Sequence, residues 1–400
     1  MILNKVNKEA MVKLQLRRDL VREVKRGHAW VYPEALRELP KAKPGTPAVL
    51  LDNRGGREIA RGYYDPQGAI ALRVCTTQHG EKLSEAWAAR QLQVALDLRR
   101  RLFDGQTTGY RLFNGEGDGL PGVVCDVYGE SAVLKLDGPA AVGFWDSAGL
   151  AAWLAENLAL NLVYERMRQR GAEGIARVGA APGGPVRFLE HGMQLTADVA
   201  RGQKTGFFLD QRENRKLVRQ LAAGKRVLNV FGYTGGFSVA AGLGGAAEVI
   251  TVDTAKAALA AADEHWALNG LPEAKHTSTA ADAFEYLERA AQGGESWDLV
   301  ILDPPSFAPS QQAVPQALAA YEKLIGAGAR VTTSGGMLLA GSCSSHVDQQ
   351  AFLQACAQGI SLARRKATTL GIYGQPADHP APLAMPELRY LKMVLLRVDV

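Results

Sequence analysis

The chain has few cysteines, no metal-binding spacing and no long apolar run. Its four cysteines, Cys75, Cys125, Cys343 and Cys356, form no CxxC pair, which argues against a zinc ribbon and suits the reducing cytoplasm. The seven histidines show no HxxxH spacing, so no metal is predicted. No apolar run reaches the roughly 18 residues of a transmembrane helix, and charged residues follow closely from Lys5 on. These absences argue against a membrane span or a signal peptide, and a cytoplasmic protein is expected.

The net charge is small, at +5, but it is unevenly distributed. Residues 1–43 hold eleven Lys and Arg against five Asp and Glu, whereas the rest of the chain is close to neutral. A basic N-terminal module on a neutral body suggests a docking surface for a polyanion such as RNA. The alternative is a solvated charged face. A length of 400 residues exceeds one ordinary core, so two or three domains are expected.

Residues 225–253 carry the best-defined motif of the chain. An apolar strand is expected at 227–230, then a glycine-rich turn, a helix from about Phe237, and a second strand at 249–252 that leads to an acid. This order is the first half of a nucleotide-binding βαβ unit, in which backbone N–H groups and the helix N-terminus face the ligand. An ordinary parallel βαβ unit with a glycine loop is the alternative. The candidate cofactor-binding residues here are Phe231, Gly232, Tyr233, Thr234, Gly235 and Asp253.

The glycine pattern limits which class of nucleotide the turn can bind. No Lys-Ser or Lys-Thr follows the glycines, as a phosphate-binding loop requires, and the G-x-G-x-x-G fingerprint of dinucleotide enzymes is missing. Asp253 can still bind two ribose hydroxyls. A ligand with a free ribose and no need for a phosphate cradle is S-adenosylmethionine, which is the predicted cofactor.

Further polar residues follow the later strands of the same α/β pattern. Asp282 and Ala283 lie where a strand meets a helix, Asp303 ends the buried strand 297–302, and Cys343 follows the strand 336–340. Because the carboxyl ends of parallel strands share one edge, these residues are expected to face one crevice with the glycine turn. Asp282 could bind an adenine amino group there.

The crevice residues predict chemistry on a pyrimidine ring. Carbon 5 of a pyrimidine is a poor nucleophile, but a thiolate that adds to carbon 6 makes it enamine-like. Cys343 is the candidate nucleophile and needs an electropositive or helix-N-terminal environment, because the thiolate is the reactive form. Asp303 begins a rigid loop that positions the base, and Pro304 and Phe307 of that loop are candidate RNA contacts. The other three cysteines are expected to be buried small hydrophobes.

Residues 202–212, GQKTGFFLDQR, hold more charged and aromatic groups than a linker requires. The alternative is a capped helix start, with Asp210 as the N-cap of a helix that runs to about Leu221. Both readings can hold together. The segment contributes Lys204 as a candidate RNA contact, and the candidate cofactor-binding residues Phe208, Asp210, Gln211 and Arg212.

The N-terminal part reads as a small β module. Residues 11–75 alternate short strands and turns, with a short basic helix at 19–27. Arg26, His28 and Trp30 are candidate RNA contacts, although Trp30 suits a core position equally well. The run KRGHAWVYPEAL resembles the entry of a PUA-type RNA-binding domain and departs from it at Ala29, where proline is usual.

A small α+β domain is expected in the middle of the chain. A helix is predicted at 81–103, two strands within 110–136, a helix at 143–158, a strand at 162–166 and a strand pair at 187–198. The predicted domains are a PUA-like domain at 1–78, a central α+β domain at 79–190 and a Rossmann-like methyltransferase domain at 191–400. The expected fold class is therefore α/β with an added N-terminal β domain.

The order of motifs resembles one known family. GFFLDQR, NVFGYTGGFS, VD, DPPSF, SCSSH, DHP and PELRYLK follow one another as in the RlmI-type rRNA methyltransferases, over essentially the whole chain. The resemblance implies a class I enzyme that uses S-adenosylmethionine to make 5-methylcytosine in 23S ribosomal RNA or a large-subunit precursor. It implies covalent catalysis by Cys343 and base positioning by Asp303. Two-cysteine relatives carry a second thiol where this chain has Pro-Ser, so the base that removes the carbon-5 proton is unassigned.

Several alternatives stand beside this prediction. The DPPSF loop resembles the [ND]PP[YF] loop of enzymes that methylate the amino group of a purine, although its aromatic residue comes one position late. Methylation of uracil at carbon 5 is a second alternative, because it also uses a single cysteine as the nucleophile. A non-enzymatic alternative is an RNA-binding protein with a vestigial cofactor site. A homodimer built on helical faces such as 81–103 is a further alternative to internal packing of those faces.

Overall fold

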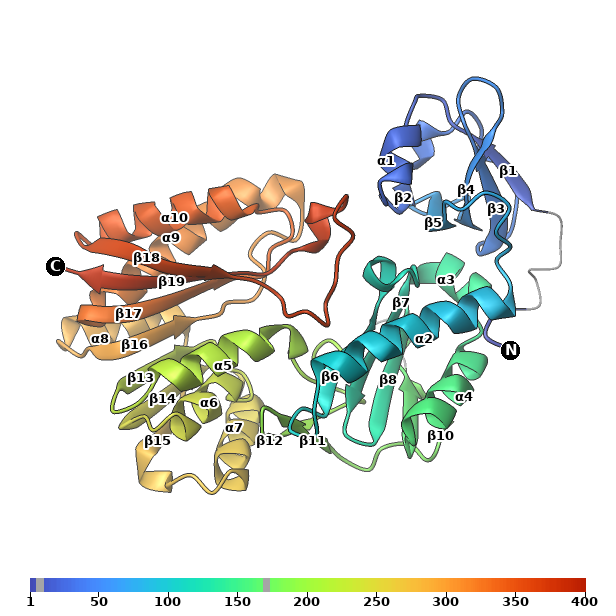
Figure 1. The fold of residues 1–400 in the computed structure, drawn as a ribbon. Coiled ribbons are helices and arrows are strands. Elements are labelled where there is room, and N and C mark those ends of the chain that lie inside the picture. The colour runs from blue at the N-terminus through green and yellow to red at the C-terminus, as the bar shows by residue number, and fades with distance from the viewer. Residues whose placement is uncertain (5–10, 168–172) are drawn as a thin grey trace. The chain divides into compact units, whose positions relative to one another are not determined.

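The computed structural model describes residues 1–4, 11–167 and 173–400 (Figure 1). Lys5, Lys8 and Glu9, which contribute to the charge of the N-terminal module, lie outside the described residues. The chain forms two compact units. The first unit contains Met1–Leu189, Thr196–Leu209 and Ala377–Pro386, and the second contains Glu190–Leu195, Asp210–Pro376 and Glu387–Val400.

The first unit begins with a five-stranded sheet in the order β1-β3-β4-β5-β2. Its inward side chains, among them Leu14, Leu50, Tyr64 and Leu72, are fully buried and form a core of their own. The expected basic helix is present but short. The elements are β1 (Val12–Gln15), α1 (Val21–Lys25), β2 (Trp30–Val31), β3 (Thr46–Leu51), β4 (Glu58–Tyr64) and β5 (Leu72–Thr76).

A second five-stranded sheet, in the order β10-β9-β8-β7-β6, follows in the same unit. The two strands predicted within 110–136 are present on either side of the turn at Gly129 and Glu130, and a third strand that was not predicted, β6, precedes them. The predicted helix at 143–158 is two helices, because Trp145 has extended backbone angles and the Asp146 carboxylate caps the second helix. The elements are α2 (Glu85–Leu102), β6 (Gly109–Asn114), β7 (Val123–Tyr128), β8 (Ser131–Leu136), α3 (Gly138–Phe144), α4 (Ser147–Leu158), β9 (Leu162–Glu165) and β10 (Ile175–Val178).

The strand pair predicted at 187–198 is present as β11 (Val186–Glu190) and β12 (Met193–Ala197), which turn at His191 and Gly192. The chain passes between the two units here and again after Leu209. The domain boundaries predicted from the sequence stay predictions.

The second unit contains a seven-stranded sheet in the order β15-β14-β13-β16-β17-β19-β18. The first five strands are parallel, and β19 runs antiparallel between β17 and β18. The strands are β13 (Arg226–Val230), β14 (Glu248–Asp253), β15 (His276–Ala280), β16 (Trp297–Leu302), β17 (Thr332–Ser342), β18 (Lys366–Tyr373) and β19 (Lys392–Asp399).

Helices cover both faces of this sheet (Figure 1). One face carries α5 to α7 and the other α8 to α10, so the central strands are apolar on both sides, as in the buried run WDLVIL of β16. The helices are α5 (Arg212–Leu221), α6 (Gly236–Leu243), α7 (Lys256–Leu268), α8 (Ala283–Gln292), α9 (Val314–Arg330) and α10 (Gln349–Leu362).

The strand order indicates where a ligand would bind. The chain moves outward from β13 in one direction to β15 and then returns to β16 on the other side of β13. Ligands of open α/β sheets bind outside the carboxyl ends of the strands, at such a switch point. The predicted fold class, a Rossmann-like sheet with an N-terminal small β domain and a central domain, is confirmed. Over the described part of the chain, no helix has the length and apolar character needed to cross a membrane.

Candidate active site

The glycine turn between β13 and α6 is tight and strained. Phe231 and Tyr233 have positive φ angles of 60° and 47°, which non-glycine residues adopt at a cost of about 1–3 kcal/mol each. Gly235 has φ of 74° and caps α6. A Cβ atom on Gly232 would lie 2.4 Å from Cγ2 of Thr251. The turn is therefore pressed against β14, and this strain is of the kind found at functional sites.

Asp253 is fixed beside this turn. Its Oδ2 accepts a hydrogen bond from the Tyr233 N–H at 2.9 Å, and its Oδ1 accepts one from the Ala255 N–H at 2.9 Å. The Thr234 carbonyl lies 2.8 Å from Nδ1 of His265, which ties the turn to α7. A fixed carboxylate at the end of β14 beside the glycine turn, without a lysine for phosphate, fits the ribose of S-adenosylmethionine.

Asp282 lies at the end of the neighbouring strand, as predicted, and caps α8. Its Oδ1 accepts hydrogen bonds from the N–H groups of Phe284 and Glu285 at 2.9 and 3.1 Å. Its other oxygen has no hydrogen-bond partner among the described residues, and the side chain is exposed. Helix capping alone can explain this residue, but it leaves Oδ2 available for an adenine amino group. Ala283, the first residue of α8, is buried.

The residues that precede α5 form a buried polar network. The Asp210 carboxylate accepts a hydrogen bond from the Tyr390 hydroxyl at 2.7 Å. Gln211 donates from Nε2 to Oδ1 of Asp303 at 2.9 Å and accepts at Oε1 from Asn214 at 2.6 Å. Gln211 therefore fixes the carboxylate that was predicted to position the base.

The N-cap prediction for Asp210 was wrong. The N-cap of α5 is Gln211, whose side chain makes no capping hydrogen bond. A 3₁₀ turn at Leu209–Gln211 places Asp210 one residue too early for capping. Arg212, the first residue of α5, is 1% exposed, and its Nε donates to Glu213 at 3.2 Å.

The remaining residues of the 202–212 segment belong to the first unit. Phe208 is half-buried, and the Lys204 ammonium lies 4.6 Å from the centre of its ring. Lys204 is exposed and has a φ angle of 54°. Their roles as cofactor and RNA contacts stay predictions.

The structure brings the Asp303 loop and the Cys343 turn together. The Cys343 thiol is half-buried and donates to the Pro304 carbonyl at 3.8 Å. Oγ of Ser344 lies 3.1 Å from Oγ of Ser306 and 2.9 Å from the Tyr321 hydroxyl. Hydrogen bonds on both sides of the cysteine thus join the ends of β16 and β17 into one local structure.

Two residues of this region were missed from the sequence. Tyr321 of α9 accepts a hydrogen bond from Oγ of Ser342 at 3.0 Å, so its hydroxyl supports both serines that flank the cysteine. Lys392 begins β19 and pairs with Ser342 at the end of β17. Its presence in the PELRYLK motif was the available signal, but nothing in the spacing shows that an antiparallel strand returns beside Cys343.

The surroundings of the other three cysteines disfavour the thiolate; Cys125 and Cys356 are buried as expected, whereas Cys75 is half-buried. Burial raises the pKa of Cys75 well above its ordinary value and also raises that of Cys125. Burial raises the pKa of Cys356 to about 12. A raised thiol pKa leaves little thiolate at neutral pH.

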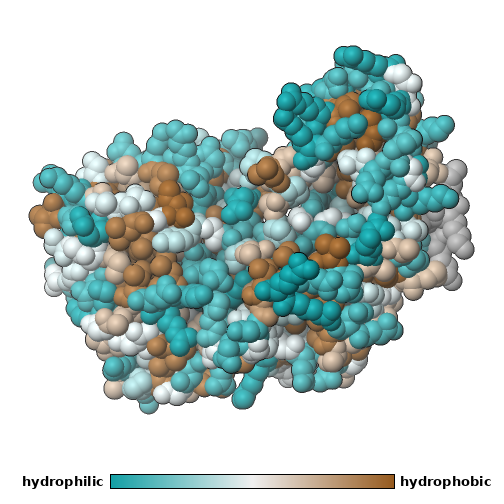
Figure 2. Space-filling model, in the orientation of Figure 1, coloured by the Kyte–Doolittle hydropathy of each residue, from teal (hydrophilic) through white to brown (hydrophobic). Residues whose placement is uncertain are grey.

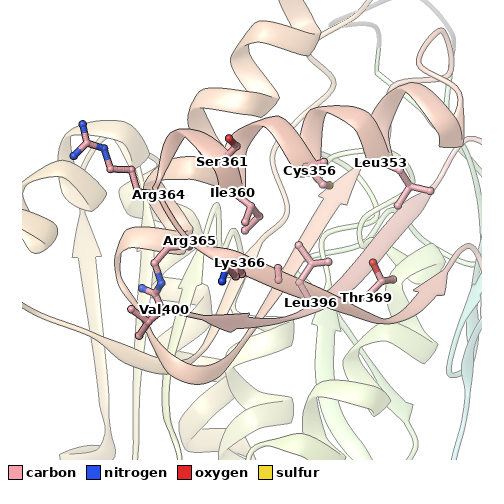
Figure 3. Close-up of a pocket in the computed structure, with 12 residues that line it drawn as sticks. Leu353, Cys356, Ile360, Ser361, Arg364, Arg365, Lys366, Thr369, Leu396 and Val400 are labelled. Carbon is pink, nitrogen blue, oxygen red and sulfur yellow. The ribbon is translucent and has the colours of Figure 1, made fainter.

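Cys356 contacts a cavity of about 610 Å³ between α10, β18 and β19 (Figure 3). The cavity lies beside Leu396 and Val400 near the end of β19. Val398 there pairs with Gly336, at the start of β17, whereas Cys343 follows the other end of that strand. The cavity is therefore separate from the crevice.

The predicted RNA contacts of the N-terminal sheet have different surroundings. Arg26 is exposed at the end of α1, where the surface is largely hydrophilic (Figure 2). His28 is half-buried, with Nδ1 3.1 Å from the Trp30 carbonyl. The Trp30 indole donates to Glu116 at 2.8 Å. Trp30 thus packs against the central part of the same unit, and its proposed contact with RNA is untested.

Across residues 1–4, 11–167 and 173–400, no three His, Cys, Asp or Glu side chains come together as a metal site would require. The prediction that the protein uses no metal stays a prediction.

Two family models match the chain. Residues 146–363 match the model of an S-adenosylmethionine-dependent methyltransferase, and residues 14–77 match that of a PUA-like domain. The first match covers more than half of the chain and includes the glycine turn, Asp253, Asp282, Asp303 and Cys343.

Curated relatives are similar over nearly the whole length. A ribosomal RNA large subunit methyltransferase from Deinococcus radiodurans is 40% identical over 393 residues, which cover 94% of this chain and 95% of its own. Ribosomal RNA large subunit methyltransferase I from Erwinia tasmaniensis is 35% identical over 396 residues, which cover 97% of this chain and 99% of its own.

Two solved structures have the same architecture. A protein from Streptococcus mutans described as a SAM-dependent methyltransferase superposes with a TM-score of 0.84 at 26% identity, covering 97% of this chain and all of its own. A structure described as a methyltransferase complexed with SAH gives a TM-score of 0.85 at 26% identity, with the same coverage.

Proposed function

Because this chain belongs to the RlmI-type family of S-adenosylmethionine-dependent rRNA methyltransferases, we propose that it methylates carbon 5 of a pyrimidine, cytosine, in large-subunit ribosomal RNA. Membership confirms the predicted family and S-adenosylmethionine as the predicted cofactor. The choice of carbon 5 and the covalent route through Cys343 are the proposal. With such an RNA as substrate, the enzyme would act in the cytoplasm.

The observation that carries the proposal is the thiol at the end of β17. Cys343 is half-buried at the carboxyl edge of the sheet, hydrogen-bonded to the Pro304 carbonyl and joined through Ser344 to Ser306. Asp303 begins this loop and is fixed by Gln211. A nucleophile and a fixed carboxylate beside a cofactor turn are the groups that covalent pyrimidine methylation needs.

The proposed chemistry begins with the sulfur of Cys343. The thiolate forms a bond to carbon 6, and the electron pair of the carbon 5–carbon 6 double bond moves onto carbon 5. Bound S-adenosylmethionine would supply the methyl group that carbon 5 takes, and its sulfur would keep the electron pair of the broken bond as S-adenosylhomocysteine. A base then removes the carbon-5 proton, the double bond forms again, and the carbon 6–sulfur bond breaks to return the thiolate. The ring thus exchanges one proton for one methyl group, and Cys343 is regenerated.

Methylation of a purine amino group is the main rival. In that chemistry the aromatic residue of the DPPSF loop clamps the base. Here the Phe307 ring is half-buried and packs against Tyr321 with 4.8 Å between ring centres. This packing favours a structural role for Phe307. Methylation of uracil carbon 5 uses the same groups, and no residue described here separates it from cytosine.

Substitution of Cys343 tests the proposal. Cys343→Ala is expected to reduce methyl transfer to large-subunit RNA at least about 1000-fold, because the attacking group is lost. Binding of S-adenosylmethionine should stay within about twofold, since the cofactor turn is untouched. The measurement is transfer of labelled methyl groups, with binding followed by calorimetry.

Cys356→Ala is the matched control, because it removes a buried thiol from α10, beside the cavity that is separate from the crevice. It should retain transfer if the protein stays folded. Wild-type activity in the Cys343 variant would exclude covalent catalysis and favour amino methylation.

A further inference from the structure

Lys392 is a buried cation beside the proposed nucleophile. It is 4% exposed, and it pairs across the sheet with Ser342, the residue before Cys343. Its Nζ donates to the Ser344 carbonyl at 2.7 Å and to the Val347 carbonyl at 2.6 Å. One ammonium group thus holds the two sides of the turn that follows the cysteine.

Two carbonyl groups do not offset the cost of burying a full charge. Burial accordingly lowers the pKa of Lys392 to about 8, while Cys343 and Asp348 favour its charged form. The electrostatic coupling between Lys392 and Cys343 acts in both directions, because a thiolate that stabilises an ammonium is stabilised by it to the same extent.

We propose that Lys392 is a positioning residue for the proposed reaction, whose ammonium stabilises the Cys343 thiolate and whose hydrogen bonds fix the turn that orients the sulfur. The inference rests on the function proposed above. The Lys392 ammonium provides the electropositive environment that a cysteine nucleophile needs, which could not be located from the sequence. Lys392 keeps its proton throughout this role, and the thiol proton leaves to solvent before the attack.

Other titratable groups surround the pair. Burial raises the pKa of Tyr321 on α9, so its hydroxyl stays neutral between Ser342 and Ser344. Asp348 caps α10 and is exposed, and Asp303 at the end of β16 is bonded to Gln211. His346, three residues after the cysteine, is exposed. Lys392 is distinguished from these groups by being both positively charged and buried.

The test is the alkylation rate of Cys343 by iodoacetamide between pH 6 and 10, measured by peptide mass spectrometry. In Lys392→Met, the pH of half-maximal rate should rise by about one to two units, which lowers the rate at pH 7 about 10- to 100-fold. Lys392→Arg retains the charge and should lie nearer the wild type. Cys356 in the same digests is the internal control and should react slowly in every variant.

An unchanged alkylation profile in a Lys392→Met protein with wild-type cofactor binding and melting temperature would overturn the inference. If that variant does not fold, the pH dependence of Cys343 alkylation in the wild-type protein tests the inference. A midpoint below the roughly 8.5 of an ordinary thiol supports the role of Lys392, and a midpoint at or above it overturns the role. Alkylation needs neither RNA nor cofactor, so it is independent of whether Cys343→Ala loses methyl transfer.

Discussion

Around Cys343, the turn that carries the sulfur is fixed by side chains from three different elements. Ser342 and Ser344 come from the end of β17, the Tyr321 hydroxyl from α9 and the Lys392 ammonium from β19. Each makes a hydrogen bond within or to the turn, so the turn that carries the sulfur is held by a network rather than by one contact. Networks of this kind stabilise a defined geometry only when every member is satisfied.

The lowered pKa of Lys392 also predicts a pH dependence of stability. Between about pH 8 and the ordinary lysine value of 10.5, the unfolded chain keeps a proton that the folded protein has lost. The free energy of unfolding attributable to this residue therefore rises with pH across that window and is constant below it. Urea denaturation at pH 7.5 and pH 10 should show wild type gaining stability relative to Lys392→Met. A difference between the two proteins that does not change with pH would contradict the burial of a charged lysine.

At the scale of elements, the site consists of two separate local structures. One is the turn from β13 to α6, and the other is formed by the loops after β16 and β17. The turn is fitted closely to β14, with Asp253 bonded to Tyr233. The two loops are joined to each other through Ser344 and Ser306. Cofactor binding and nucleophile geometry can therefore be disturbed separately.

Gly232→Ala is expected to disturb the cofactor turn. The added Cβ would lie 2.4 Å from Thr251 Cγ2, so the turn or β14 must shift, at a cost of about 1–3 kcal/mol in stability. Affinity for S-adenosylmethionine should fall at least about tenfold, measured by calorimetry, while alkylation of Cys343 is unchanged. Gly55→Ala is the control, since no atom lies within 4 Å of its added Cβ. Wild-type cofactor affinity in Gly232→Ala would mean that the turn does not contact the cofactor.

Strands β14, β16 and β17 could be predicted from the sequence because each ends a buried run at or just before a polar residue. This pattern placed Asp253, Asp303 and Cys343 at one edge, whereas Asp282 was placed there because a strand was expected to meet a helix beside it, and that strand, β15, is half-buried or exposed along its length. Lys392 could not be placed, because β19 reverses direction and its register depends on pairing with β17.

Predictions from the local sequence failed for side chains that bond to residues far away in the chain. Asp is a residue type that often caps helices, but a 3₁₀ turn precedes α5 at Asp210. The Asp210 carboxylate instead accepts a hydrogen bond from the Tyr390 hydroxyl. Trp30 lies beside basic residues, yet its indole donates to Glu116, which lies far away in the sequence. Neither partner is visible in the local sequence.

At the scale of the whole molecule, the candidate docking surface for RNA lies in the first unit. The exposed basic residues of α1 lie on the small N-terminal sheet, on a hydrophilic surface (Figure 2). That sheet packs within its own unit, where the Tyr63 ring stacks on Phe144 and its hydroxyl donates to the Pro121 carbonyl. Deleting the sheet would expose these contacts, so point substitutions are the better probe of RNA docking.

Replacing Arg22, Lys25 and Arg26 together with alanine should weaken RNA binding without changing cofactor affinity. Each lost phosphate contact lowers the slope of log affinity against log salt by about 0.7–0.9, so the slope should fall by roughly two to three. Filter binding to large-subunit RNA at 50–200 mM salt measures it. The control replaces three exposed basic residues of the second unit, Arg330, Arg364 and Lys366. An unchanged slope in the α1 variant would mean that RNA docks elsewhere.

Methylation at carbon 5 must expel the hydrogen that carbon 5 carried. Large-subunit RNA labelled with tritium at carbon 5 of its cytosines, incubated with the enzyme and S-adenosylmethionine, should release one tritium to water for each methyl group gained. The Cys343→Ala protein should release none. Methyl transfer by the wild-type enzyme without any tritium release would contradict carbon-5 chemistry on cytosine and with it the proposed role of Cys343.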